Sequence, residues 1–573
     1  MKSIRKIAVG VAMLSTLILL LVALPNNMNT NRRGRVSANT QSAEPPTQSS
    51  ELVTPDLTIS ISQAPIATPG DLTLDREINP RFALNGPANP AFAGGILGGI
   101  DPLLAVQDSV TLNPLGSFTT PILSFNGQGY TGVNPPDTVG DVGPDHFVQM
   151  VNNNISSYIR IYNKSGSLVA GPTILSSLGS GGICVTEASG DPVVVYDEMA
   201  DRWLLSEFTY PSNNLCVYIS SGPNPVTSTW YRYLFTTPEF PDYPKYAVWA
   251  DAYYVSSNEN SPAVYAMDRA NMLTGSPATA PIRRTASILN GFGFQALTPA
   301  DHDGDTTPPA EAPGYFMRHR DDEVHNSSSN NPTQDYIEIW AYDVNWATPA
   351  SSTFTLITTI AVAEFDSSLC GLVSFSCIQQ PGTNIRLDPL REVMMYRLQY
   401  RNFGTHEVLV GNFATDVNGA DRSGVRWFEL RKSGAGGWSL YQEGTFAPNS
   451  DSHSRWMGAI AMDGAGNIAL GYNASSTTQY PSLWYTGRLA TDPIGTMPQG
   501  EGVMVNGTAS NSSNRYGDYA SMSVDPADDC TFWFTGEYNS TSAWNTRIAT
   551  FKFDFCSGAP ISYFFPLMLS EAE

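Results

Sequence analysis

The pattern that decides the fold is clearest in the stretch Ile460-Ala461-Met462-Asp463-Gly464-Ala465-Gly466-Asn467-Ile468-Ala469-Leu470. An apolar run reaches an aspartate, a turn follows, and a second apolar run begins. The pattern recurs at Met522–Trp533 and at Val194–Leu205, and weaker copies centre on Asp141, Asp251, Asp301 and Asp388. Seven strand–turn–strand units spaced about 50 to 90 residues apart are typical of a β-propeller. We therefore predict an all-β protein with a single β-propeller of about seven blades, with six as the alternative.

The composition agrees with such a fold and limits the partners of the protein. Charged residues make up 15% of the chain, and 48 Gly and 41 Pro suit many tight turns between short strands. The formal net charge is −22. Because an acidic surface repels phosphate, we do not expect the protein to bind nucleic acid.

The N-terminus predicts export. Lys2, Arg5 and Lys6 precede the largely apolar run Ile7–Leu24, and Val36–Ala38 offers small residues for cleavage. The run is near the length of a membrane-spanning helix, so an uncleaved membrane anchor is the alternative to a signal peptide. We expect a signal peptide or anchor at 1–38, a Ser/Thr/Pro-rich, partly disordered linker at 39–120, the propeller at 121–556 and a tail at 557–573.

Strand-length runs of β-branched and aromatic residues dominate the predicted propeller. Examples are His146–Val151, Ile155–Tyr162, Tyr336–Tyr342 and Arg547–Phe555. The one helix predicted inside the propeller is short, from Asp268 to Leu273. In the linker, Leu57–Ile61 alternates in polarity and predicts a single strand.

Six cysteines in an exported chain suggest disulfides, and fifteen pairings are possible. Pairing between neighbours along the chain is the simplest, and it predicts Cys184–Cys216, Cys370–Cys377 and Cys530–Cys556.

A candidate metal site lies at Asp301-His302-Asp303-Gly304-Asp305. Asp301, Asp303 and Asp305 surround a glycine, and carboxylates around a tight turn can direct several oxygens at Ca²⁺. The alternative is an acidic surface turn. No G-x-S-x-G, H-E-x-x-H or phosphate-loop motif occurs.

A candidate ligand site comes from polar residues that precede several copies of the aspartate pattern at matching places. In a propeller the innermost strand of each blade lines the channel, so these residues are expected at one mouth: Asp137, Asp242, Lys245, Arg455, Arg515, Asp518 and Tyr519. The alternative is that they join neighbouring blades through Arg–carboxylate bonds. Separately, strand alternation places Arg397 and Arg401 on one face.

The chain also resembles a group of exported, largely uncharacterised bacterial proteins with a sialidase-like β-propeller. The residues that carry this resemblance are Arg455–Gly458, Ala461–Asp463, Asn467–Tyr472, Tyr485–Arg488, Tyr516–Tyr519 and Asp525–Trp533. The resemblance covers about residues 130–556 and implies a secreted or cell-surface protein. We predict a non-catalytic module that binds a glycan or protein at the channel mouth. The alternative is a sialidase-type glycoside hydrolase, which would hold a substrate carboxylate with an Arg cluster.

Overall fold

The computed structural model describes residues 51–67, 76–77, 99–112, 118–289, 294–325, 331, 333–371, 375–554 and 556, all within the unit Thr47–Glu573. The predicted signal segment 1–38 and the tail 557–573 lie outside the described residues. Within this described part, no helix combines the length and the apolar character needed to cross a membrane.

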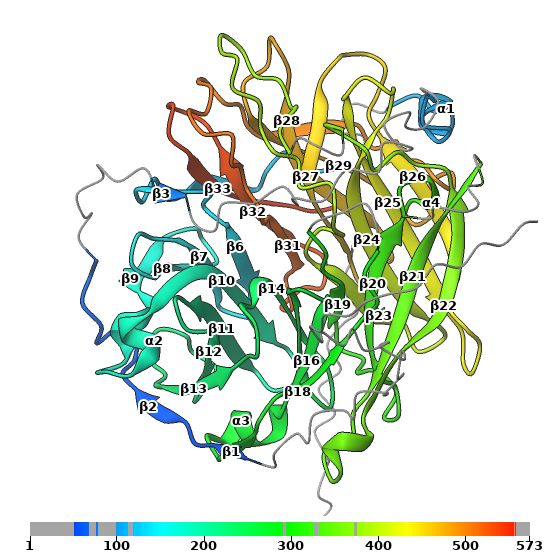
Figure 1. The fold of residues 1–573 in the computed structure, drawn as a ribbon. Helices are drawn as coiled ribbons and strands as arrows, with labels where there is room; N and C mark the ends of the chain where they lie inside the picture. Colours follow the sequence, from blue (N-terminus) through cyan, green and yellow to red (C-terminus); the bar gives the residue numbers. More distant parts are fainter. Residues whose placement is uncertain are drawn as a thin grey trace, which may run out of the picture. The chain divides into compact units, whose positions relative to one another are not determined.

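Four-stranded antiparallel sheets make up most of the molecule, and each is named here after its innermost strand (Figure 1). The β6 sheet contains β6 (Val139–Val142), β7 (His146–Asn152), β8 (Ser157–Asn163) and β9 (Leu168–Ile174). The β10 sheet contains β10 (Ala188–Asp197), β11 (Arg202–Thr209), β12 (Asn214–Ser220) and β13 (Trp230–Thr236). The β14 sheet contains β14 (Asp242–Val248), β15 (Tyr253–Asn258), β16 (Ala263–Met267) and β18 (Ile282–Thr285).

The next eight strands form two such sheets, joined where β19 and β23 run parallel. The β19 sheet contains β19 (Thr298–His302), β20 (Gly314–Arg320), β21 (Gln334–Asp343) and β22 (Thr353–Ala363). The β23 sheet contains β23 (Leu398–Asn402), β24 (Glu407–Asp416), β25 (Ser423–Lys432) and β26 (Ser439–Phe446). The β27 sheet contains β27 (Ser454–Met462), β28 (Ile468–Ser475), β29 (Ser482–Arg488) and β30 (Glu501–Val505).

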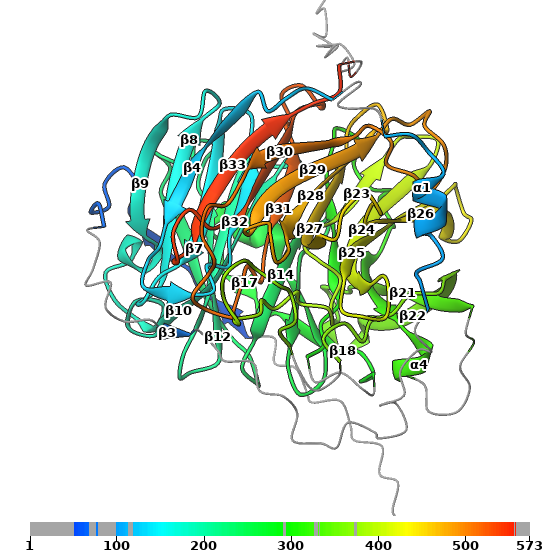
Figure 2. The ribbon, with the colours of Figure 1, turned by 90° about the horizontal axis from the view of Figure 1, so that it is seen from above.

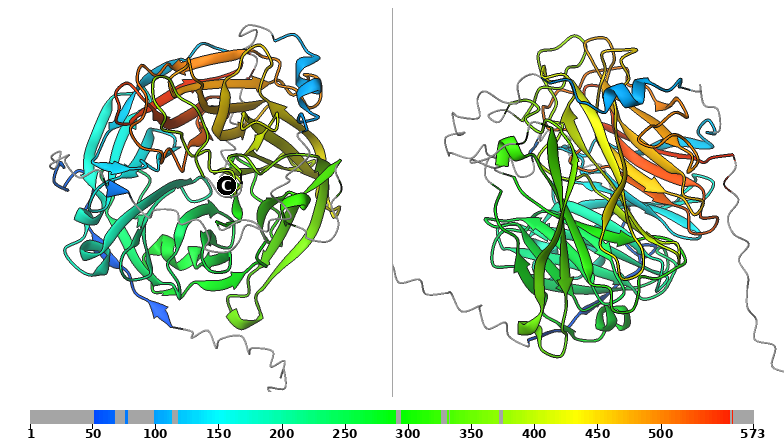
Figure 3. Two further views of the ribbon diagram at one scale, coloured as in Figure 1. Left: turned by 45° about the horizontal axis from the view of Figure 1, so that its top comes forward. Right: turned by 90° about the vertical axis from the view of Figure 1, so that its right-hand side faces the viewer.

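The last sheet closes the ring. It contains β31 (Ser521–Val524), β32 (Phe532–Tyr538) and β33 (Asn545–Phe551), and its outer strand is β4 (Leu123–Gly129) from the start of the domain (Figure 2). Each innermost strand contacts the innermost strand of the next sheet, and β31 contacts β6. The sheets therefore stand radially around one axis (Figure 3, left), and the fold is a β-propeller.

Apolar and aromatic side chains fill the space between neighbouring sheets. Phe147 of the β6 sheet stacks on Trp533 of the β31 sheet, with ring centroids 5.2 Å apart. A buried aromatic removes roughly 200 Å² from water, worth up to about 5 kcal/mol. The inner strands are crowded: a Cβ at Gly140 of β6 would lie 2.5 Å from the Phe147 ring.

In the two clearest copies of the pattern, the repeated aspartate stabilises the turn that follows it by accepting backbone hydrogen bonds. Asp463 Oδ1 accepts hydrogen bonds from the backbone N–H groups of Ala465 and Asn467, both at 2.9 Å. Asp525 Oδ1 accepts one from Ala527 at 3.0 Å. The prediction of a strand–turn–strand unit centred on Asp388 was wrong, because Asp388 lies in the connection before β23 rather than at the end of an inner strand. That connection, between β22 and β23, is long, so a local pattern in it was mistaken for a repeat.

Segments of the predicted linker pack on the propeller. Strand β2 (Asp56–Thr58), near the predicted strand Leu57–Ile61, adds a fifth strand to the β10 sheet. Strand β1 (Leu52–Val53) pairs with β17 (Ala278–Thr279), β3 (Arg76–Glu77) pairs with β5 (Val133–Asn134), and helix α1 (Leu104–Asp108) packs on β26. The predicted helix is present as α3 (Arg269–Thr274), whose first turn is capped by Asp268.

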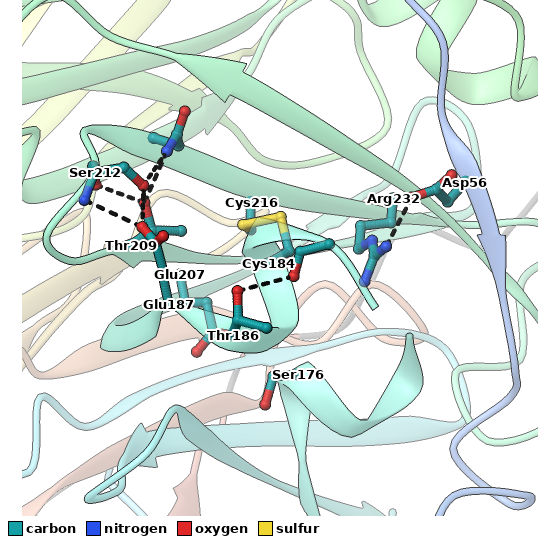
Figure 4. The surroundings of a disulfide bond; sticks show 12 residues. Asp56, Ser176, Cys184, Thr186, Glu187, Glu207, Thr209, Ser212, Cys216 and Arg232 are labelled. Atoms are coloured by element: carbon teal, nitrogen blue, oxygen red, sulfur yellow. Dashed lines mark hydrogen bonds and ion pairs between the residues drawn. A yellow bond between two sulfur atoms is a disulfide. The ribbon is translucent and has the colours of Figure 1, made fainter. Parts of the chain in front are cut away.

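All three predicted disulfides are present: Cys184–Cys216, Cys370–Cys377 and Cys530–Cys556. The first joins helix α2 (Ile183–Thr186) to β12 (Figure 4). Beside it, Arg232 of β13 pairs with Asp56 of β2 at 2.7 Å and so ties the fifth strand to its sheet. The remaining short helices are α4 (Asp322–His325), η1 (Leu175–Leu178) and η2 (Pro349–Ser351).

Candidate binding site at one end of the propeller

One backbone feature recurs where the inner strands begin. The register shifts near the start of β10, β14 and β27, and each irregularity holds a non-glycine residue with positive φ: Asp191 (45°), Tyr243 (54°) and Met457 (51°). Asp137 before β6 (47°) and Asp518 before β31 (59°) share this conformation. It is uncommon outside glycine. Bulges of this kind bend a strand and redirect its side chains, so the repeat turns polar groups toward one end of the ring.

Side chains from four sheets meet at that end. We call this group the mouth cluster; its members are Asp137, Asp191, Asp242, Tyr243, Lys245, Arg515, Asp518 and Tyr519. Lys245 lies at its centre, with Nζ 3.1 Å from the ring centroid of Tyr243 and 3.3 Å from that of Tyr519. The cluster therefore contains six of the seven predicted ligand-site residues.

Two reciprocal hydrogen bonds cross the mouth between β14 and the segment before β31. Tyr243 Oη donates to the carbonyl of Asp518, and Tyr519 Oη donates to the carbonyl of Pro244, each at 2.9 Å. Arg515 pairs with Asp518 in its own segment. These bonds join sheets that are not neighbours in the ring, so the cluster fixes the diameter of the mouth.

The electrostatics of the mouth cluster are dominated by burial. Lys245 is fully buried, its Nζ has no hydrogen-bond acceptor among the described residues, and burial lowers its pKa well below the ordinary value against the pull of four carboxylates. Burial and the neighbouring acids raise the pKa of Asp137 strongly and that of Asp191 to about 7. The neighbouring carboxyl group of Asp191 contributes, after burial, to the raised pKa of Asp137.

Arg455 lies apart from the mouth cluster. Its guanidinium is fully buried and binds both oxygens of Glu501, at 2.7 and 2.9 Å, and those of Asp451 at 3.1 and 2.9 Å. All three residues belong to the β27 sheet or its leading loop. Arg455 thus ties the inner strand of this sheet to its outer strand.

The predicted metal residues lie near the other end of the inner strands and contact arginines. Asp301 binds Arg397, and Asp303 lies 3.4 Å from Arg401. Gln399 also donates to Asp303. Asp305 is exposed. The carboxylates of Asp301 and Asp303 are therefore held by side chains of β23 and the residue just before it.

Arg397 occupies the centre of the ring. It lies 3.0 Å from Asp141 of β6, binds Asp301 of β19, and donates to Ser523 of β31 at 2.9 Å. Arg397 and Arg401 are each about 5% exposed and both face inward, as strand alternation predicted. Both guanidinium groups are paired with carboxylates of the chain itself.

Sequence reasoning missed Asp191 and Tyr243. Asp191 stands six residues before Asp197, and Asp137 stands four residues before Asp141, so a search just upstream of the second copy could have found Asp191. Tyr243 lies in β14 between the predicted residues Asp242 and Lys245, so the same stretch of sequence contained it.

An open cleft of about 490 Å³ lies where segments 376–386 and 512–514 meet. Its lining is polar except for Ile385 and contains no carboxylate: Ser376, Asn384, Ile385, Arg386, Ser512, Ser513 and Asn514. Asn514 Nδ2 donates to Ser376 Oγ at 3.4 Å, and the backbone N–H of Asp388 donates to the carbonyl of Asn514 at 3.0 Å. The segment 512–514 leads directly into Arg515, so the cleft adjoins the mouth cluster.

No protein-family model matches the chain, and no curated protein matches it. Some solved structures have a similar backbone. One is an ulvan lyase, a polysaccharide lyase of family PL25. It is 11% identical, the match covers 75% of this chain and 94% of that chain, and the TM-score is 0.34. A Hadza microbial sialidase shows 10% identity, coverage of 69% and 73%, and a TM-score of 0.31. An exo-β-1,3-galactanase from Phanerochaete chrysosporium shows 9% identity, coverage of 76% and 96%, and a TM-score of 0.27. At these values the similarities bear on neither the activity nor the site of this chain.

Proposed function

We propose that this protein is an exported, secreted or cell-surface propeller of seven blades that binds an extracellular glycan without catalysis. Support for seven blades comes from four separate four-stranded sheets, the five-stranded β10 sheet and the two halves of the eight-stranded sheet. The ligand lies in the cleft between segments 376–386 and 512–514. The mouth cluster beneath holds the second of these segments in place through Arg515.

The observation that carries this proposal is the separation of accessible groups from carboxylates. The cleft offers hydroxyl, amide and guanidinium groups, which can pair with sugar hydroxyls and with an acidic substituent. The carboxylates of Asp137, Asp191 and Asp518 are 2%, 6% and 6% exposed. A glycosidase needs two carboxyl groups at the scissile bond, and the burial of these three argues against that role.

A binding screen tests the proposal. The purified full-length protein is applied to a glycan array, and hits are quantified by calorimetry. Arg386→Ala and Asn514→Ala are expected to weaken binding at least fivefold. The control is Arg202→Ala. Arg202 is a half-buried arginine at the start of β11, and it donates hydrogen bonds to backbone carbonyls of the turn before that strand. Binding that is unaffected by both cleft variants, or that is seen only with proteins, would contradict the assignment.

One observation favours the sialidase-type hydrolase as a second candidate. Asp137 and Asp191 are adjacent buried carboxyl groups with raised pKa values, and they lie close to Lys245, an arrangement that acid–base pairs also use. Against it, the inward arginines Arg397 and Arg401 are already bound to carboxylates. Turnover of fluorogenic sialosides or other glycosides that is lost in Asp191→Asn would establish this candidate and exclude a non-catalytic role.

A further inference from the structure

A group of buried carboxylates lies outside the candidate binding site, at one end of the β19 sheet. We call Asp321, Glu323, Asp335 and Glu364 the acidic cluster. Asp321 follows β20, Glu323 lies in α4, Asp335 is the second residue of β21, and Glu364 follows β22. The cluster thus joins the ends of three strands and a short helix.

The geometry of three members suits a single ion. Carboxylate oxygens of Asp321, Glu323 and Asp335 all lie within 4.8 Å of one another. Two oxygens that bind one Ca²⁺ at about 2.4 Å can be separated by at most about 4.8 Å. Asp301, Asp303 and Asp305 do not form such a group.

Unsatisfied oxygens point to a missing positive partner. Glu323 is 8% exposed, and its buried Oε2 receives no hydrogen bond from the described residues. Glu323 faces the carboxylate of Asp322, and Glu364 faces that of Glu323. Glu364 also faces the backbone N–H of Gln334. Two carboxylates come together only when a proton or a cation lies between them.

No basic side chain of the described chain compensates the cluster. None of its four members forms an ion pair with Lys, Arg or His among these residues. Arg426 comes near, but it donates to the backbone carbonyl of Glu364 and pairs with Asp101 and Glu443. Burial lowers the pKa of His319 to about 3, so its imidazole is neutral.

The ligand oxygens of two members are already oriented by the backbone. Asp335 accepts from the N–H groups of Asp322 at 2.7 Å and Phe365 at 2.9 Å. Asp321 accepts from Val324 at 3.1 Å and from Ser367 at 2.9 Å. These bonds hold the carboxylates in place while like charges push them apart. Burial and mutual repulsion accordingly raise the pKa of Asp335 to about 10 and that of Glu323 to about 8.

We propose that the acidic cluster is a structural Ca²⁺ site that fastens α4 and the ends of β20, β21 and β22 together. The donors are oxygens only, which selects a hard cation over zinc or copper. Three or four carboxylates supply enough negative charge to neutralise one Ca²⁺. The proposal is independent of the glycan-binding function.

Metal content and thermal stability test the site with Ca²⁺ alone. The purified full-length protein should hold about one Ca²⁺ per chain by mass spectrometry. After removal of the metal with EGTA, its melting temperature should fall by several degrees and recover when Ca²⁺, but not the same concentration of Mg²⁺, is added. Absence of bound Ca²⁺ and an unchanged melting temperature would overturn the proposal and leave shared protons as the explanation.

Variants locate the ion. Glu323→Gln and Asp335→Asn should weaken Ca²⁺ binding at least tenfold and abolish the stabilisation by Ca²⁺. Glu364→Gln, at a partly exposed position outside the strands, serves if either of these fails to fold. Asp305→Asn is the matched control and should respond to Ca²⁺ as the unmodified protein does. A response lost in Asp305→Asn and retained in the cluster variants would place the ion at Asp301–Asp305 and refute the acidic cluster as its site.

Discussion

Replacement of Arg397 by Met should strongly destabilise the propeller. Its guanidinium is buried and contacts Asp141, Asp301 and Ser523, on three different inner strands. Methionine keeps most of the volume and removes the charge. The two carboxylates are 4% and 1% exposed and would lose their counter-ion. Removal of one partner from a buried ion pair costs about 3–5 kcal/mol.

The expected shift in melting temperature follows from the size of the domain. An unfolding entropy of about 2.1 cal/mol/K per residue gives about 0.9 kcal/mol/K for the roughly 430 residues of the propeller. A loss of 3–5 kcal/mol then lowers the melting temperature by about 3–5 °C. Differential scanning calorimetry at pH 7.5 measures this change, and Arg202→Met should leave the melting temperature within about 1 °C.

The effect should also depend on pH in a defined direction. The pKa of Asp301 is about 7 with Arg397 present, above its ordinary value, because burial outweighs the arginine. Loss of Arg397 raises this pKa further, so the folded variant retains protons that the unfolded chain releases. The stability of the Arg397→Met variant is therefore highest at low pH and is lost as the pH rises. The difference in melting temperature from the unmodified protein should become smaller as the pH falls from 7.5 to 5. In the double variant with Asp301→Asn, part of the loss should be recovered. A melting temperature that is unchanged in Arg397→Met, or a deficit that grows at pH 5, would refute this reasoning.

Further outcomes follow from the same contacts. Arg515→Ala leaves Asp518 buried without its partner and should cost about 3–5 kcal/mol in urea unfolding; a stable variant that only loses ligand would show that Arg515 contacts the ligand directly. Asp525→Ala removes the hydrogen bonds that Asp525 accepts from Ala527, from Lys164 at 2.6 Å and from Trp533 at 3.0 Å. The variant should lose about 2–3 kcal/mol of stability without a change in ligand binding. An unchanged melting temperature would contradict the structural role of Asp525. Loss of Cys530–Cys556, with a separation of 26 residues, should cost about 3.5 kcal/mol, measured as Cys530→Ala/Cys556→Ala against the oxidised protein. Burial raises the pKa of Glu207 to about 8, although Ser156 and Ser157 donate hydrogen bonds to its carboxylate. The contribution of Glu207 to stability is therefore present at low pH and falls as the pH rises toward 8. Glu207→Gln should flatten the stability profile between pH 5 and 8, and a profile parallel to that of the unmodified protein would disprove the shift.

The sequence alone determined the features that depend on residues close together in the chain. Period-two runs of β-branched and aromatic residues indicated the strands, and the aspartate pattern indicated the turns, because both rest on local backbone geometry. Cysteine pairing was predictable for the same reason: Cys184, Cys370 and Cys530 each bond to the next cysteine along the chain. The capped helix at 269–274 follows the same local logic.

Tertiary structure decided which polar residues meet. Arg455 and Arg515 occupy similar places before the repeated pattern, yet their side chains point in different directions. Arg455 binds carboxylates of its own sheet, whereas Arg515 lies in the mouth cluster, because the neighbouring side chains differ. Arg397 joins Asp141 and Asp301 only because the ring is closed, which depends on packing between sheets far apart in the chain and on β4 completing the last sheet. The acidic cluster likewise draws Asp321, Asp335 and Glu364 from three strand ends, and no spacing along the chain reveals that these ends converge.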